Sequence, residues 1–257
     1  MAFSDEEVER YARHLVLREI GGPGQQKLKA ARVLLVGAGA LGSAAAPMLA
    51  AAGVGVLGLA DMDVVSLSNL QRQVLYTVAD LGRPKVEAAA EHLNAINPEV
   101  RIQTHALAVT TENAGALVDG YDLVLDGTDD FATRFAVNAA CVAQGRMLVS
   151  GAIERWTGQV GVFAAGVTRG QPASERQPCY RCLTPEIPPD AETCARVGVI
   201  GALAGVIGSM MALEAVKLIA GAGEPLTGRV LIYDALAGET RTVRLGPDPH
   251  CSECGGP

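Results

Sequence analysis

A glycine-rich turn between two short apolar runs is the feature that most constrains the fold of this chain. Arg32–Val36 reads RVLLV and runs directly into the sequence GAGALG at residues 37–42. Small apolar residues continue to about Ala52, and a second apolar run, Gly55–Ala60, ends at Asp61, about 20 residues beyond the last glycine. Apolar runs without alternation are typical of strands buried on both faces of a parallel sheet. The pattern therefore predicts a strand, a tight turn, a helix and a second strand.

Each glycine of this turn has a physical reason to be there. Gly37 would make the tight turn, Gly39 would let a phosphate approach the backbone, and Gly42 would let the helix pack on the strand. Free N–H groups at the start of the helix favour a phosphate, and Asp61 could bind a ribose. The turn thus predicts a nucleotide site. NAD, FAD and ATP remain open at this point, as does a role of the glycines in packing alone.

The rest of the chain alternates between strand and helix patterns. This alternation predicts an α/β fold with a Rossmann-like, doubly wound, mainly parallel sheet and an antiparallel hairpin at the end. A break is expected at Gly21–Gly24, and the proline-rich stretch from Gly166 to Ala195 is expected to form a long surface loop. Further strands are expected at Val100–Thr104, Tyr121–Asp126, Met147–Ser150, Gln159–Ala164, Arg229–Asp234 and Thr240–Leu245, and further helices at Ser4–Leu17, Gln25–Ala31, Pro84–Asn97, about Glu112–Val118, Phe131–Gln144 and Val199–Ala220.

Composition excludes several classes of protein. A hydrophobic share of 49% excludes wholesale disorder, and the net charge of −7 argues against non-specific binding to nucleic acid, whose phosphates need a basic face. Met1–Arg10 is acidic and has no apolar run, so we expect no secretory signal and a cytoplasmic protein. The uncharged stretch Val197–Leu213 is barely long enough to span a membrane as a helix, and glycines interrupt it. We expect it to form a buried helix or a subunit-interface helix, in which Gly201, Gly205 and Gly208 suit close helix contact.

Polar side chains follow the second predicted strand, where a dehydrogenase would usually move on to a helix. The carboxyl ends of parallel strands meet at one edge of the sheet, which is where ligands bind in open α/β folds. Arg72 and Lys85 could supply positive charge to a polyphosphate there. A solvated loop with a helix-start lysine is the alternative. The candidate residues of this segment are Asp61, Asp63, Asn69, Arg72, Gln73 and Lys85.

Three carboxylates follow the strand that ends at Asp126. Asp126 and Asp129 are candidates for Mg²⁺, which takes one or two carboxylates together with phosphate oxygens. The alternative is that Asp129 or Asp130 caps the helix that starts at Phe131.

Six cysteines are present in the chain, and four of them form two CxxC pairs in Pro- and Gly-rich loops. Two such pairs can supply four thiolates in tetrahedral geometry, so Cys179, Cys182, Cys251 and Cys254 predict a closed structural zinc site. Two redox dithiols are the weaker alternative, because neither pair opens a helix after a strand.

Two cysteines remain outside these pairs. Cys141 lies in an apolar helix pattern and is expected in the core. Cys194 precedes Arg196 and a helix start, which would favour its thiolate, although a passive role is equally open.

Taken in order, the segments GAGALG, DMDVVSLSNLQRQ, GRPK, LDGTDD, CYRC, ETC and CSEC resemble the MoeB/ThiF/HesA family, the bacterial relatives of ubiquitin-activating enzymes. The resemblance runs from Arg10 to Cys254. It implies a single ThiF-type domain over residues 1–257, with a nucleotide-binding half at about 30–150 and a carrier-binding and zinc half at about 151–257. It also implies an enzyme that adenylates the C-terminal Gly-Gly carboxylate of a ubiquitin-like sulfur carrier with ATP and Mg²⁺, ahead of thiocarboxylate formation.

The resemblance also assigns roles to residues. Asp61 would bind the ribose, Asn69, Arg72 and Lys85 the phosphates, and Asp129 the Mg²⁺, while Arg13 would reach the ATP of the partner in a homodimer. Cys194 matches a position linked in some members to sulfur transfer. Ala40, within the ATP turn, stands where a further glycine is common, and Asp130 where asparagine is common. The chain ends before any rhodanese-like domain, so a separate sulfur donor is expected.

The sequence therefore leaves three hypotheses about function. Besides adenylation, the turn and Asp61 alone would suit an NAD- or FAD-dependent oxidoreductase, and a non-catalytic carrier-binding scaffold could keep the same fold. The pathway, whether molybdopterin, thiamine, tRNA thiolation or cysteine synthesis, is not legible in the sequence.

Overall fold

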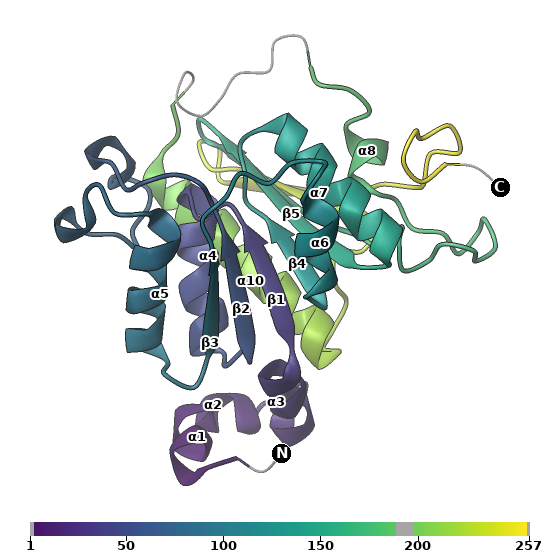
Figure 1. The fold of residues 1–257 in the computed structure, drawn as a ribbon. Helices are drawn as coiled ribbons and strands as arrows, with labels where there is room; N and C mark the ends of the chain where they lie inside the picture. Colours follow the sequence, from purple (N-terminus) through teal and green to yellow (C-terminus); the bar gives the residue numbers. More distant parts are fainter. Residues whose placement is uncertain (1–2, 189–197, 256–257) are drawn as a thin grey trace.

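Eight strands form a single sheet in the order β3-β2-β1-β4-β5-β6-β7-β8 in the computed structural model, which describes residues 3–188 and 198–255 (Figure 1). Strands β1 to β5 run parallel to one another, and β6, β7 and β8 continue the sheet from β5 in antiparallel pairs. The predicted fold class is thereby confirmed. The strands are β1 (Arg32–Val36), β2 (Val56–Ala60), β3 (Arg101–His105), β4 (Leu123–Asp126), β5 (Met147–Glu154), β6 (Thr157–Phe163), β7 (Arg229–Asp234) and β8 (Glu239–Arg244).

Helices cover both faces of the sheet, because the central strands are apolar on both sides. In β1, Val33 and Leu35 belong to one buried cluster, with residues of α4, α5 and α10, whereas Leu34 and Val36 belong to another, with residues of α6 and α7. The described helices are α1 (Asp5–Arg10), α2 (Ala12–Leu15), α3 (Gly21–Ala30), α4 (Ala40–Ala51), α5 (Lys85–Ile96), α6 (Ala114–Asp119), α7 (Phe131–Gln144), α8 (Tyr180–Leu183) and α10 (Gly201–Ala220), with 3-10 turns η1 (Leu67–Asn69) and η2 (Val78–Asp80).

The crevice that positions the site lies where the winding of the sheet reverses. Strand β1 lies between β2 and β4, and the helices that follow β1 and β4 cover opposite faces. The carboxyl ends of these strands are therefore left uncovered by the helices on either side.

Helix α10 is, within the described ranges, the one helix long and apolar enough to cross a membrane. It packs on α4 so closely that a Cβ on Gly208 would lie 2.6 Å from the carbonyl oxygen of Leu41. A Cβ on Gly201 would lie 2.2 Å from the carbonyl oxygen of Gln71, while Gly205 faces open space. Gly201 and Gly208 thus serve packing within one chain, as expected of a core helix, and they give no support to a glycine contact between subunits.

The N-terminal segment differs from its sequence prediction in two places. The expected break at Gly21–Gly24 is wrong, because α3 begins at Gly21. Pro23 is tolerated there, since the first turn of a helix needs no N–H from it. The single helix expected over Ser4–Leu17 is divided at Tyr11, whose buried ring lies against Gly53.

Candidate active site

A cavity of about 1010 Å³ lies at the carboxyl ends of β1, β2 and β4. Most of the residues that the sequence singles out for a nucleotide line this cavity. They are Gly37, Gly39, Ala40, Asp61, Asp63, Asn69, Arg72, Gln73, Lys85 and Asp129.

The glycine-rich turn forms the floor of the cavity. Gly37 has φ +88°, a conformation that favours glycine, and a Cβ on Gly42 would lie 2.0 Å from the carbonyl oxygen of Gly37. Gly39 is the N-cap of α4, and the nearest atom to a Cβ there would be Nε2 of Gln73, at 3.7 Å. The turn is thus closed on the protein side at Gly42 and less crowded at Gly39, next to the first N–H groups of a helix.

Asp61 holds the turn from the end of β2. One carboxylate oxygen accepts a hydrogen bond from the N–H of Ala38 at 2.8 Å, and the other accepts one from the N–H of Asp63 at 2.8 Å. On the other side, the hydroxyl of Tyr76 donates to the carbonyl of Ala38 at 2.7 Å. Burial raises the pKa of Tyr76, and the charge of Asp61 adds to this shift, so the phenol stays a donor. The carboxylate of Asp61 therefore has a fixed orientation and keeps acceptor capacity for a hydroxyl.

The cationic groups come from the segment between β2 and α5. Lys85 is buried at the start of α5, and its Nζ lies 2.8 Å from a carboxylate oxygen of Asp63, which is exposed. Arg72 is half-buried and donates to the carbonyl of Ser68 at 2.9 Å. Gln73 is only 4% exposed, and its Oε1 has no hydrogen-bond partner among the described residues. A buried amide oxygen on a cavity wall suits a ligand that carries a donor, because it is otherwise unsatisfied.

The three aspartates after β4 separate into three roles. Asp126 is buried, and its two oxygens accept hydrogen bonds from Thr128, Ser150 and Arg134. Asp130 caps α7 by accepting from the N–H of Thr133 at 2.8 Å. Backbone N–H groups that donate to Asp126 and Asp130 thus fix the backbone around Asp129, whose own side chain is exposed and borders the cavity. Of the two Mg²⁺ candidates, the geometry favours Asp129, because Asp126 is already fully bonded.

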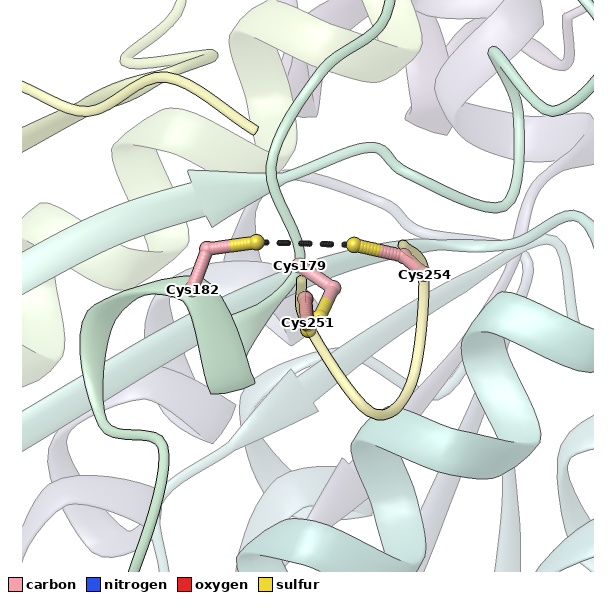
Figure 2. Close-up of side chains that lie close together, drawn as sticks. All are labelled: Cys179, Cys182, Cys251 and Cys254. Atoms are coloured by element: carbon pink, nitrogen blue, oxygen red, sulfur yellow. Dashed lines mark hydrogen bonds between the residues drawn. The ribbon is translucent and has the colours of Figure 1, made fainter. Parts of the chain in front are cut away.

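The four predicted metal ligands lie together, and none of them lines the cavity (Figure 2). All four sulfurs lie within 4.8 Å of one another, with 3.6 Å between Cys179 and Cys251 and 3.4 Å between Cys182 and Cys254. A tetrahedral zinc with Zn–S bonds of about 2.3 Å requires S–S distances of about 3.8 Å. Burial raises the pKa of Cys254, whereas the hydrogen bond with Cys179 lowers the pKa of Cys182. The cluster could bind a metal ion.

Two of the predicted active-site residues within the described ranges do not line the cavity. Arg13 is exposed on α2 and is one of them. Gly42 supports the turn from below. Cys194 lies outside the described residues, as does Arg196. Cys141 is buried in α7 as expected.

A family model described as "ThiF family" matches residues 11–254 of the chain. The chain belongs to the ThiF family. The sulfur carrier protein adenylyltransferase of Thermus thermophilus is 46% identical over 99% of this chain and 93% of its own length. The molybdopterin-synthase adenylyltransferase of Escherichia coli is 45% identical over 98% of each chain. The probable adenylyltransferase/sulfurtransferase MoeZ of Mycobacterium tuberculosis is 48% identical over 96% of this chain, which spans 62% of that longer relative.

Solved structures support the ThiF-family fold. A crystal structure of Escherichia coli MccB with MccA-N7isoASN superposes with a TM-score of 0.82 over 96% of this chain and 75% of that one, at 23% identity. The structure of MccB with ATP gives a TM-score of 0.78 over 99% of this chain and 83% of that one, at 20% identity. At this level of identity the likeness concerns the fold alone.

Two residues of this ThiF-family site were missed by the sequence reading. Arg134 and Tyr180 are both 4% exposed, and both line the cavity. A signal for Arg134 was present, because a charged residue stands on the apolar face of the predicted helix Phe131–Gln144. Tyr180 gave no such signal, since it stands between two cysteines in a segment read as a loop.

Proposed function

We propose that this chain activates the C-terminal carboxylate of a ubiquitin-like sulfur carrier that ends in Gly-Gly. The carboxylate attacks the α-phosphate of ATP, which gives a carrier acyl-adenylate and pyrophosphate ahead of thiocarboxylate formation. The observation that carries the proposal is one cavity, in a member of the ThiF family, that combines a glycine turn, a fixed Asp61, two cationic side chains and an exposed Asp129.

The nucleotide is proposed to lie along the wall between β1 and α5. The fixed carboxylate of Asp61 suits the ribose hydroxyls, and the first N–H groups of α4 suit a phosphate. Arg72 and Lys85, with Asn69 and the Nε2 amide group of Gln73, which faces Gly39, suit the remaining phosphates. The ion pair between Lys85 and Asp63 keeps the ammonium in the cavity wall, where phosphate oxygens can replace the exposed carboxylate as its partner.

Attack of one anion on another requires positive charge placed beforehand. Arg72 and Lys85 supply it from side chains whose positions are already held by hydrogen bonds. Asp129 would hold Mg²⁺, which supplies neutralisation of the phosphate oxygens when it is bound. The exposed carboxylate of Asp129 beside a cavity large enough for a nucleotide fits that ion.

Several finer assignments belong to the same proposal. Cys179, Cys182, Cys251 and Cys254 would hold a structural Zn²⁺ with no open coordination position. Residues of about 30–150 would bind the nucleotide, and residues of about 151–257 would bind the carrier and the zinc.

Arg13 would act across a homodimer, since it is exposed on α2 and does not line the cavity of its own chain. The sulfur would come from a separate donor protein. Cys194 is the candidate residue for this sulfur-transfer step.

Exchange of pyrophosphate into ATP, measured with candidate carriers that end in Gly-Gly, tests the proposal. We expect carrier-dependent exchange, and we expect Asp129→Ala to lower it by about 10²- to 10³-fold without a change in the free energy of unfolding. Asp119→Ala is the matched control, since Asp119 is an exposed carboxylate at the end of α6 that does not line the cavity. An absence of exchange with every such carrier would exclude the function, whereas equal loss in both variants would remove the special role of Asp129.

A further inference from the structure

Arg134 is a buried cation in the cavity wall that the proposed chemistry leaves unused. Its Nη1 donates to Asp126 at 3.1 Å and to the hydroxyl of Ser150 at 2.9 Å. Its Nη2 donates to the carbonyl of Gly151 at 2.8 Å and to the carbonyl of Thr128. One side chain thus joins the end of β4 and the middle of β5 to the turn that carries Asp129.

This bonding pattern decides what kind of role Arg134 can have. A guanidinium has five N–H donors, and the four on the two terminal nitrogens are all committed to protein acceptors. A substrate phosphate or carboxylate could not be held in the bidentate way that arginine offers anions. Arg134 is therefore suited to hold the backbone at Thr128, immediately before Asp129, and not to bind the substrate.

Tyr180 lies on the guanidinium of Arg134, with 5.8 Å between Cζ and the ring centroid. The ring is buried against Phe163, at 5.5 Å between centroids, and against Phe135, at 6.2 Å. The N–H of Tyr180 donates to Oδ1 of Asn138 on α7 at 2.7 Å. The ring is thus held at α7, on the face where Arg134 and Asn138 lie.

The position of Tyr180 depends in turn on the four-cysteine cluster. Tyr180 stands between Cys179 and Cys182 in the sequence and is the first residue of the short helix α8. The second cysteine pair is tied to the same helix by the ion pair of Arg181 and Glu253, at 3.6 Å. A four-residue helix has little stability of its own, so its position is set by what binds the cysteines on either side.

We propose that Tyr180 and Arg134 are positioning residues that couple the four-cysteine cluster to the cation site at Asp129. The cluster fixes Tyr180, Tyr180 fixes the plane of Arg134, and Arg134 fixes the turn that presents the carboxylate. This inference rests on the proposed function. It adds that metal at the cysteines strengthens the binding of a divalent cation with ATP, although the two sites share no ligand.

Binding of Mn²⁺ together with a non-hydrolysable ATP analogue, followed by electron paramagnetic resonance, tests the coupling without turnover. Tyr180→Leu removes the aromatic face, and we expect it to weaken Mn²⁺ binding by about 3- to 30-fold, the range of one cation–π contact. Tyr180→Phe keeps the ring and removes only the hydroxyl, which also interacts with Arg134, so we expect it to weaken Mn²⁺ binding less than Tyr180→Leu does. Zinc content and circular dichroism of each variant report whether the cluster and the fold remain intact.

Two further measurements distinguish the coupling between the cysteine cluster and the cation site from a general loss of packing around Tyr180. Phe163→Leu removes a neighbouring ring that no contact joins to Arg134, and we expect less than a twofold change. Stripping the cysteine metal from the native protein should weaken Mn²⁺ binding to the level of Tyr180→Leu, and stripping that variant should add no further loss. Native-like Mn²⁺ binding in Tyr180→Leu, equal loss in Phe163→Leu, or additive losses would overturn the coupling alone. A native protein that binds no analogue would overturn the proposed function with it.

Discussion

The cavity has two walls whose polar side chains are paired differently. Residues 37–85 form the first wall, and β4, β5 and α7 form the second. On the first wall, Gln73 keeps an unsatisfied amide oxygen and Lys85 is paired only with the exposed Asp63. On the second wall, the charge of Arg134 is neutralised inside the protein by the buried Asp126. The first wall is therefore suited to exchange its partners for a ligand. The second is suited to hold a shape, with Asp129 as its exposed exception.

The largest effect should come from breaking the second wall. Arg134→Met leaves Asp126 as a buried charge without its partner, and we expect the free energy of unfolding to fall by about 3–5 kcal/mol. Urea denaturation measures this loss. Adding Asp126→Asn to the variant should restore part of the stability, because the uncompensated charge is then gone. A loss below about 1 kcal/mol would mean that the two walls do not differ in this way.

A smaller effect, seen in activity and not in stability, should follow from the first wall. Lys85→Met keeps the buried stem and removes the charge, and we expect pyrophosphate exchange to fall by about 10²-fold. The free energy of unfolding should change by less than about 1 kcal/mol, since the partner carboxylate of Asp63 stays solvated. Exchange and urea denaturation on the same preparation give both numbers. A large loss of stability with intact exchange would reverse the comparison.

The smallest effect concerns the one buried carboxylate that supports the first wall. Burial alone would raise the pKa of Asp80, but the hydrogen bonds from His92 and Thr77 outweigh it and lower the pKa from 3.8 to about 2. A lowered pKa stabilises the fold above pH 3.8, and this contribution is lost as the pH falls towards 2. We expect the stability difference between the native protein and Asp80→Asn to shrink over that range, as measured by denaturation at each pH. A constant difference would contradict the assignment.

The first wall could be read from the sequence because it is local. The turn, Asp61 and Lys85 all belong to one strand–helix–strand unit and the segment after it, so strand ends alone place them at one edge. The strand β1 was also predicted to the residue, since its apolar run is unbroken, and the start of α7 was predicted because a capping aspartate precedes it.

The second wall could not be read in the same way. Arg134, Ser150 and Tyr180 meet through tertiary contacts between three separate elements, and no spacing in the sequence brings them together. The break expected at Gly21–Gly24 was wrong for a related reason. Composition suggested a loop there, but Gly24 packs against Ala220 at the end of α10, and this contact supports a helix.

The distance along the chain between the two cysteine pairs has a consequence for biosynthesis. Cys179 meets Cys251, 72 residues later, so the cluster can close only after the ribosome has released the chain beyond Cys254. The parallel strands of the sheet are translated long before that moment. A nascent polypeptide can therefore assemble its nucleotide turn early, while the segment that carries Tyr180 waits for Cys251 and Cys254 to be synthesised. Metal capture at the cysteines would then follow the formation of the parallel strands.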